Sequence, residues 1–214
     1  MDERLRESVA VTRAAVRGGQ LRGQALRQRL LAVPGSDRDL WLDGVLSLPE
    51  LPEDQPSLPP GTVPYLPCSV DVVLAALDEA PVGVGDVFVD LGAGLGRVVL
   101  LAQLLCGARA IGIELQPQLC AGAQLAATAL GLADAAFVCG DAAERCPGEG
   151  TVFFVYASFG LAALRRVLAR LYAIASQRRI TLCAVDFAVP SGEYPWLRPR
   201  ASSRCELVFY DSQV

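Results

Sequence analysis

Hydrophobic and polar residues alternate along the chain in two patterns, which exchange regularly from about residue 69 onward. Short runs rich in β-branched residues predict strands, and longer segments with apolar residues every three or four positions predict helices. The predicted strands are 87–91, 109–114, 135–140, 151–157, 179–187 and 204–210, and the helices among them are 96–106, 117–131 and 160–176. This alternation predicts an α/β fold, with a doubly wound, mostly parallel sheet covered by helices on both faces.

The segment before residue 69 has a different pattern. Apolar residues at helical spacing predict one or two helices over 3–32, with a break at Gly18-Gly19. Seven prolines between Pro49 and Pro67 predict an extended linker, and a helix with Ser69 as its N-cap follows. We therefore expect a helical arm and proline-rich linker over residues 1–60, followed by one main domain over 61–214.

The stretch VFVDLGAGLGR, residues 87–97, carries the densest chemical signal. Asp90 ends a predicted buried strand, where its side chain would face either solvent or a ligand. Gly92, Gly94 and Gly96 follow at every second position and precede an apolar helix. Glycine allows a positive φ and a close approach of the backbone, and helix N-termini offer free amides. The stretch predicts a loop that cradles a bound molecule.

Composition narrows the chemistry. The chain has 214 residues and is 52% hydrophobic, which suits a globular domain, and we expect no membrane span or signal peptide and a cytoplasmic location. Seven cysteines without a CxxC motif predict buried, reduced thiols. Histidine is absent and all 19 basic residues are arginine. Histidine triads, histidine metal sites, phosphate-loop lysines and Schiff bases are therefore excluded.

Charge is unevenly distributed along the chain. The first 32 residues hold seven arginines and three acids, whereas residues 30–90 hold eleven acids and one arginine. The basic arm would either contact a nucleic acid or partner, or lay its arginines over a packed amphipathic hairpin, and we favour the hairpin. The acidic segment would either attract a cationic molecule or serve as solvated surface, and we favour the surface reading.

Acidic residues end the first three predicted strands of the sheet. Asp90 ends the first, Glu114 the second in AIGIEL, and Asp141 follows the third in FVCGDA. In a doubly wound sheet the ligand lies beyond the carboxyl ends of the strands, where the winding order reverses. We therefore expect these three carboxylates to surround one site.

Residues 62–214 resemble the class I S-adenosylmethionine-dependent methyltransferases, which have a Rossmann-like fold. The resemblance rests on VDLGAGLG, GIELQ and CGDAAE, and this glycine spacing differs from the nicotinamide fingerprint G-x-G-x-x-G. Within that class the segments 63–100 and 151–171 are most similar to the non-SET, telomeric-silencing histone lysine methyltransferases. That family carries two asparagines after the fourth strand, where this chain has Tyr156 and Ala157.

The resemblance implies a role for each matching residue around S-adenosylmethionine. Glu114 would bind the ribose hydroxyls, Asp141 the adenine amino group and the Ala142 amide a ring nitrogen. Leu115 would either cover the adenine or simply pack. The methionine portion would lie near the glycine loop, at Asp90, Gly92, Gly94 and Gly96. Tyr65 would close over it as part of a lid.

Methyl transfer from a sulfonium depends mainly on orientation, which an active site without histidine or lysine can supply. Tyr156 and Ser158, after the fourth strand, are the candidate catalytic residues on the acceptor side. No metal is expected, because the acid that metal-dependent relatives carry after the fourth strand is Tyr156 here. The acidic balance favours a cationic protein or a small molecule over nucleic acid as acceptor. Two alternatives stay open: an inactive cofactor-binding module and an NAD(P)-dependent oxidoreductase.

Overall fold

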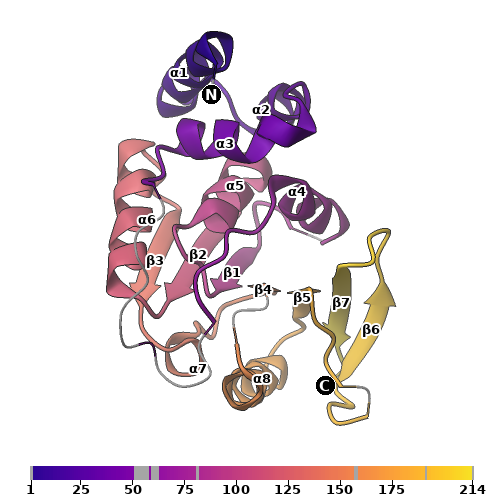
Figure 1. Cartoon of the computed structure of the whole chain (residues 1–214). Helices are drawn as coiled ribbons and strands as arrows, with labels where there is room; N and C mark the ends of the chain where they lie inside the picture. Colours follow the sequence, from indigo (N-terminus) through magenta and orange to yellow (C-terminus); the bar gives the residue numbers. More distant parts are fainter. Residues whose placement is uncertain are drawn as a thin grey trace.

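The fold is built on one sheet of seven strands in the order β3-β2-β1-β4-β5-β7-β6 (Figure 1). The computed structural model describes residues 2–50, 58, 63–80, 82–156, 159–190 and 192–213. Strands β1 to β5 are parallel, while β7 runs antiparallel to β5 and β6 antiparallel to β7. The strands are β1 Val87–Leu91, β2 Arg109–Glu114, β3 Ala135–Cys139, β4 Val152–Tyr156, β5 Thr181–Val185, β6 Leu197–Ala201 and β7 Leu207–Ser212.

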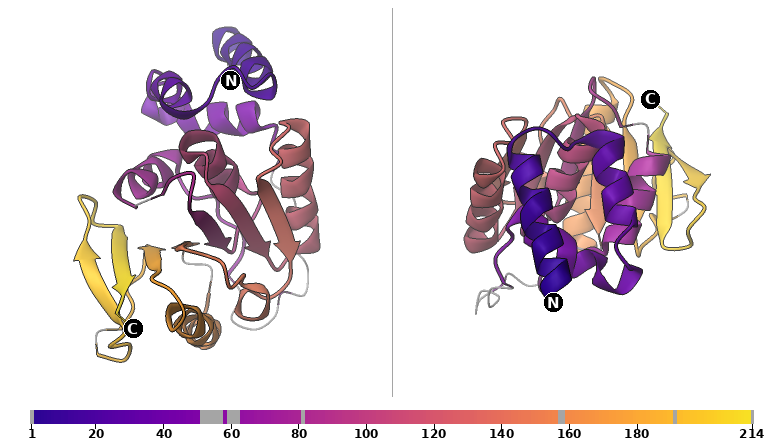
Figure 2. Two further views of the ribbon diagram at one scale, coloured as in Figure 1. Left: turned by 180° about the vertical axis from the view of Figure 1, so that it is seen from behind. Right: turned by 90° about the horizontal axis from the view of Figure 1, so that it is seen from above.

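Helices cover both faces of this sheet (Figures 1 and 2). Within β1, Phe88 packs into one hydrophobic core, whereas Val89 and Leu91 pack into the core on the other face. The first core lies under α4, α5 and α6, and the second under α7 and α8. These helices are α4 Val70–Glu79, α5 Arg97–Cys106, α6 Pro117–Ala129, α7 Ala142–Arg145 and α8 Leu161–Ala175. The predicted α/β fold with a doubly wound, mostly parallel sheet is confirmed.

Three N-terminal helices pack outside α4 and α5 (Figure 2). They are α1 Glu3–Arg17, α2 Gly23–Leu31 and α3 Arg38–Leu46, with a short 3₁₀ turn at Gly35–Asp37 before α3. Trp41, Leu42 and Leu46 of α3 are fully buried in the same core as Phe88 and Leu100. The helical arm therefore shares the core of the sheet, and the domain boundary expected near residue 60 lies outside the described residues.

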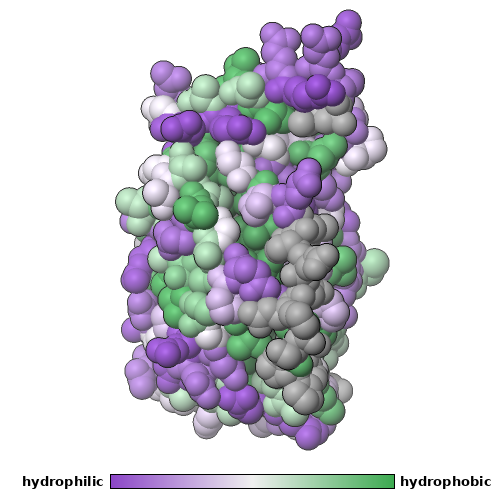
Figure 3. Space-filling view, turned by 60° about the vertical axis from the view of Figure 1, so that its left-hand side comes forward, coloured by the Kyte–Doolittle hydropathy of each residue, from purple (hydrophilic) through white to green (hydrophobic). Residues whose placement is uncertain are grey.

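Arginines of the arm bind backbone carbonyls and neighbouring acids. Arg13 donates to the carbonyl of Gly44, Arg22 to that of Val16, and Arg27 pairs with Asp78. Other polar side chains of the arm face outward, and hydrophilic residues gather at the top of Figure 3. These contacts agree with arginines laid over packed helices, but the expected hairpin is wrong, because α1 packs against α3 and α2 mainly against α5.

Local pattern predicted most element bounds to within a few residues, and the differences have physical reasons. Strand β6 was missed because Arg198, Pro199 and Arg200 interrupt its apolar pattern, and proline is tolerated on an edge strand. The predicted strand 204–210 is wrong at its start, since 204–206 form a turn and β7 begins at Leu207. Helices α3 and α7 were also missed.

Two further expectations need correction. Ser69 occupies the N-cap position of α4, but its side chain makes no capping hydrogen bond, and the N–H of Val70 donates to Oδ1 of Asp39 instead. The cysteines are all free, yet Cys139 and Cys205 are exposed because the first ends the edge strand β3 and the second lies in the β6–β7 turn. Among the described residues, no helix has the length and apolar character needed to cross a membrane.

Candidate active site

The loop between β1 and α5 takes the conformation that its glycines predict. Gly92, Gly94 and Gly96 have φ values of 98°, 54° and 84°, a region that side-chain-bearing residues rarely adopt. The N–H groups of Gly92 and Ala93 both donate to the carbonyl of Ile113, at 2.9 and 3.0 Å. The loop is thereby tied to the end of β2, beside the point where the sheet reverses its winding between β1 and β4.

Glu114 ends β2 and holds this loop from within. Its Oε2 accepts the N–H of Gly94 at 2.7 Å, and its Oε1 accepts the N–H of Gln116 at 2.8 Å. Burial raises the pKa of the Glu114 carboxyl, while hydrogen bonds from the backbone at Gln116, Gly94 and Leu115 act in the opposite direction. A carboxylate has about four acceptor positions, so capacity remains for a further donor. Glu114 thus holds the loop in place and can still accept a hydrogen bond from a hydroxyl group.

Asp90 lies deep in the sheet, with only 2% of its surface exposed. The solvent-facing alternative for this side chain is therefore wrong, since β1 lies between β2 and β4 and the segment of Tyr65 and Cys68 lies near this carboxyl. Burial, with the neighbouring carboxylate of Glu114, raises the pKa of Asp90 well above its usual value. Within the described part of the chain, no group donates a hydrogen bond to it. A buried carboxyl in this setting favours either a bound proton or a cationic partner.

Tyr65 lies against the bare backbone of Gly94. A Cβ added to Gly94 would lie 2.0 Å from Cε2 of Tyr65, so the ring occupies the space that a side chain would need. Burial raises the pKa of Tyr65 to about 12, opposed by Arg97 and by a hydrogen bond with the Leu95 backbone. The absence of a side chain at Gly94 therefore lets the Tyr65 ring pack against the backbone of the loop.

Gly96 serves packing rather than direct access to the site. A Cβ at this position would lie 2.5 Å from Cζ of Phe137 and 3.0 Å from Cβ of Ala123. A Cβ added to Gly112 of β2 would lie 2.6 Å from Cδ1 of the same ring. The glycine at position 96 is therefore explained by contact between α5, β2 and β3.

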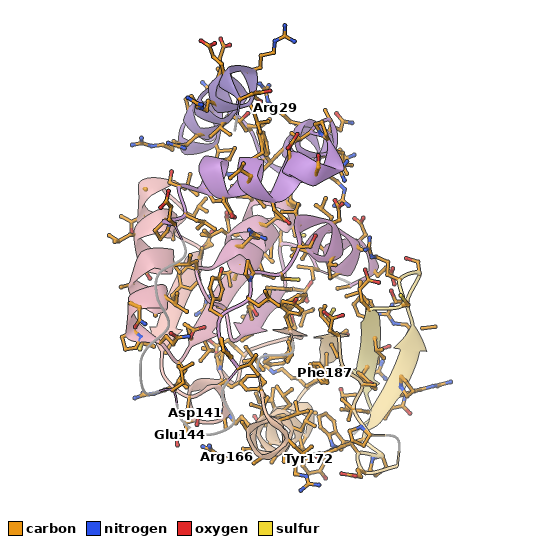
Figure 4. The ribbon with its side chains drawn as sticks, viewed as in Figure 1. Arg29, Asp141, Glu144, Arg166, Tyr172 and Phe187 are labelled. Carbon is orange, nitrogen blue, oxygen red and sulfur yellow. The ribbon has the colours of Figure 1, made fainter. Side chains whose placement is uncertain are left out.

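Asp141 and Ala142 begin helix α7 beyond β3. The Asp141 side chain accepts the N–H of Ala143 at 2.8 Å, and Arg166 of α8 lies 3.0 Å from its other oxygen. Arg166 also contacts Glu144, so the three side chains cluster between α7 and α8 (Figure 4). Ala142 is buried, and no described residue accepts its N–H. The pair of groups expected at the adenine edge is present, with Asp141 already bound to an arginine.

The remaining site residues lie at the ends of β2, β4 and β5. Leu115 is 38% exposed, high for a leucine that follows a buried strand. Tyr156 is half-buried at the end of β4, and its pKa is raised by burial, then by Cys68 and Asp186. The neighbouring candidate Ser158 lies outside the described residues.

Asp186 is a further candidate for the site that the sequence did not reveal. It follows β5, is exposed, and has a φ of 60°. The predicted strand 179–187 included it, so it carried no signal of its own. A left-handed conformation at a side-chain-bearing residue is strained and often marks a functional position. The backbone turn directs this carboxylate to the edge where Tyr156 ends β4.

Arg97, the first residue of α5, connects the glycine loop to the N-terminal helices. Its guanidinium forms a double contact with Asp43 of α3, at 2.9 and 2.6 Å, and a further one with Asp39 at 3.2 Å. It also donates to the carbonyl of Cys68 at 2.7 Å. Arg97 is 5% exposed, and this network fixes the segment that leads from Tyr65 into α4. Sequence reasoning missed it because all three partners lie far away in the chain.

Metal ligands do not gather at this site. In the part of the chain that the structure describes, no group of three or more cysteine, aspartate or glutamate side chains is arranged to hold a metal ion.

Comparison with known proteins identifies the class. The family described as histone methylation protein DOT1 matches residues 65–136. A solved RNA methyltransferase from Salinibacter ruber, in complex with S-adenosyl-L-homocysteine, is 30% identical over 69% of this chain and 92% of its own, with a TM-score of 0.54. The mitomycin 7-O-methyltransferase MmcR shares the fold at 16% identity, with a TM-score of 0.54 over 68% of this chain and 54% of its own. No curated protein matches.

The seven-stranded sheet, the glycine loop and this degree of identity define the class: the chain belongs to the class I S-adenosylmethionine-dependent methyltransferases. The match to the DOT1 family covers the stretch from Tyr65 to β3, which includes the glycine loop and Glu114. The resemblance seen in the sequence is confirmed.

Replacing Arg97 by Met is expected to destabilise the fold by about 3 kcal/mol, because Asp43 and Asp39 lose a largely buried partner. Urea unfolding followed by circular dichroism measures the change. Arg109→Met is the matched control, since the pair of Arg109 and Glu149 is half-exposed and is worth about 0–1 kcal/mol. Equal losses for the two variants would show that the Arg97 network contributes no more than a surface pair.

Asp90→Asn is expected to raise stability increasingly as pH rises. The folded wild type holds the Asp90 proton above the unfolded pKa of about 3.9, so its stability falls as pH rises toward the raised folded pKa. Asparagine does not titrate and escapes this loss. Thermal unfolding of both proteins without ligand, from pH 4 to pH 8, should show a growing difference in Tm. A difference that is constant with pH would refute a raised pKa.

Proposed function

We propose that this chain transfers the methyl group of S-adenosylmethionine to an acceptor at the carboxyl edge of the sheet. The observation that carries the proposal is the loop held by Glu114, with glycines at positive φ beside the buried carboxyl of Asp90. The chemistry of these residues suits the donor, because two buried carboxyls and a glycine-rich backbone match a ligand that carries an ammonium and ribose hydroxyls. When bound, the donor supplies a methyl group already activated on a sulfonium.

The donor-binding roles follow from the chemistry of each group. Glu114 would accept the ribose hydroxyls with its remaining lone pairs, and charge-assisted bonds of this kind are stronger than neutral ones. Asp90 would face the ammonium of the methionine portion, which explains a buried carboxyl without a donor nearby. The free N–H of Ala142 and the carboxylate of Asp141 would face the adenine, with Leu115 against its ring.

Four further residues would shape the methionine end and the acceptor end. Gly92 and Gly94 let the loop approach the methionine portion, and Tyr65 forms the wall opposite Gly94 as part of a lid. Tyr156 would contact the acceptor from the end of β4. Alignment of nucleophile, methyl and sulfur supplies on the order of 7 kcal/mol or more in favourable systems, so no proton-transferring histidine is needed.

A cationic acceptor, either a protein amine or a small molecule, fits the charges around the opening best. Asp186 presents an exposed carboxylate beside Tyr156, the chain carries a net charge of −4, and the matching family is named for histone methylation. The acidic segment 30–90, for which we favoured solvated surface over steering of a cation, includes Glu53 and Asp54, which lie outside the described residues. RNA is the second candidate, supported by the Salinibacter ruber relative.

Localisation and metal use complete the proposal. All seven thiols are free, which supports a reducing compartment such as the cytoplasm. We propose catalysis without a metal, because orientation of the donor and acceptor suffices for this reaction.

The experiment that tests the function uses the purified chain and donor labelled in its methyl group. Incubation with a cell extract, followed by separation of protein, RNA and small molecules, should place label in one fraction. Stabilisation by S-adenosylhomocysteine without any transfer would indicate an inactive binding module. Stabilisation by NADH alone would instead favour the oxidoreductase alternative.

Glu114→Ala is expected to weaken S-adenosylhomocysteine binding by about 1.5–3 kcal/mol, the scale of charge-assisted hydrogen bonds. It should also lower stability, because the N–H groups of Gly94 and Gln116 lose their acceptor. Calorimetry below the melting transition separates the two effects. Glu7→Ala on the exposed face of α1 is the control, and equal affinity for the two variants would overturn the assignment.

Asp186→Asn tests the cationic acceptor. Asparagine tolerates the left-handed backbone, so only the charge changes. With the acceptor found by label transfer, KM should rise about tenfold at low salt while donor affinity stays constant. Glu193→Gln, an exposed acid in the segment after β5, is the control. An unchanged KM would leave Asp186 a role in the turn alone.

A further inference from the structure

A cavity of about 1000 Å³ lies at the amino ends of the parallel strands, whereas the glycine loop lies at their carboxyl ends. The residues that line it include Thr151, just before β4, and Ile180, just before β5, which mark the amino ends of these parallel strands. Strand β6 and the end of β7 form its other side, at the right of Figure 1. The cavity is separate from the donor site, which occupies the carboxyl ends of the same strands.

Three arginines line this cavity, and two of them have no ion-pair or hydrogen-bond partner among the described residues. Arg179 and Arg198 are exposed, and neither makes an ion pair or hydrogen bond with any residue in the described ranges. Arg200 is held in place by Asp211, by the carbonyl of Glu79 at 3.2 Å and by the ring of Phe209. Among the described residues, the cavity thus has one cation held by neighbours and two whose side-chain donors have no partner.

Two acids also line the cavity, and each already accepts hydrogen bonds. Asp86 accepts the hydroxyl of Thr151 at 2.9 Å and the N–H of Gly83 at 3.0 Å. Asp211 accepts the hydroxyl of Thr181 at 3.0 Å in addition to Arg200. The lining holds three arginines against these two acids, so it carries a net positive charge within a chain whose net charge is −4.

We propose that this cavity binds an organic phosphate of about nucleotide size. Arginine forks match phosphate oxygens in pairs, and the guanidinium is less strongly hydrated than an ammonium. Pro199 supplies exposed apolar surface for a ring or chain attached to the phosphate, while Val152 and Ile180 of the lining are buried beneath it. The volume lies at the upper end of small-molecule pockets, about 300–1,000 Å³, and exceeds what a bare phosphate needs. Size and charge together favour a phosphorylated organic molecule.

The test uses the full chain with saturating S-adenosylhomocysteine, so that the donor site is filled. Uridine diphosphate is the probe, because it lacks the adenine that the donor site would accept. The melting temperature should rise with probe concentration, and uridine without phosphate should give a much smaller rise. Inorganic pyrophosphate should give an intermediate one.

The double variant Arg179→Ala/Arg198→Ala should bind uridine diphosphate at least about tenfold more weakly. Arg17→Ala/Arg29→Ala removes the same charge from exposed positions of α1 and α2 and should bind like wild type; Arg29 is labelled in Figure 4. Methyl transfer and donor affinity should not change in either double variant.

Three results would overturn the proposal. The first is no stabilisation by uridine diphosphate or pyrophosphate, and the second is equal affinity in the two double variants. The third is tight, Arg179- and Arg198-dependent binding of a single-stranded RNA oligonucleotide without binding of uridine diphosphate. That result would make the cavity part of a polynucleotide contact.

Discussion

The buried guanidinium of Arg97 is the contact on which the arrangement of the site depends. It lies where the glycine loop becomes helix α5, and it binds Asp43 and Asp39 of α3 together with the carbonyl of Cys68. Asp39 in turn accepts the first N–H of α4. One cation therefore fixes an N-terminal helix, the start of α4 and the entry segment that carries Tyr65 against the loop.

The same packing explains why the site carboxyls are perturbed. Asp90 is buried at the end of β1, near Tyr65 and Cys68, and Glu114 is buried and accepts the N–H of Gly94. Two buried acids with raised pKa values are costly in the free protein, and a cation or hydroxyl donor relieves that cost. On the donor-binding roles proposed for Asp90 and Glu114, the loss of stability in the free protein would be recovered as affinity for an ammonium and a ribose.

The sheet gives its two edges opposite character. Parallel strands end together, so Asp90, Glu114 and Asp186 lie at the carboxyl ends of the strands. At the amino ends the same strands begin beside a β6–β7 hairpin that carries Arg198 and Arg200. One sheet thereby keeps a group of acids and a group of arginines at opposite ends of its strands.

The sequence by itself determined the alternation of strands and helices, the glycine loop and the acids at the strand ends. Those features are encoded locally, by the periodicity of apolar side chains and by the conformational freedom of glycine. Only the tertiary structure decided that Asp90 is buried, that the Tyr65 ring lies on Gly94, and that Arg97 binds Asp43. Those facts depend on residues about 29 to 58 positions apart that meet when α3 and α4 pack on α5, and no local pattern encodes such a meeting.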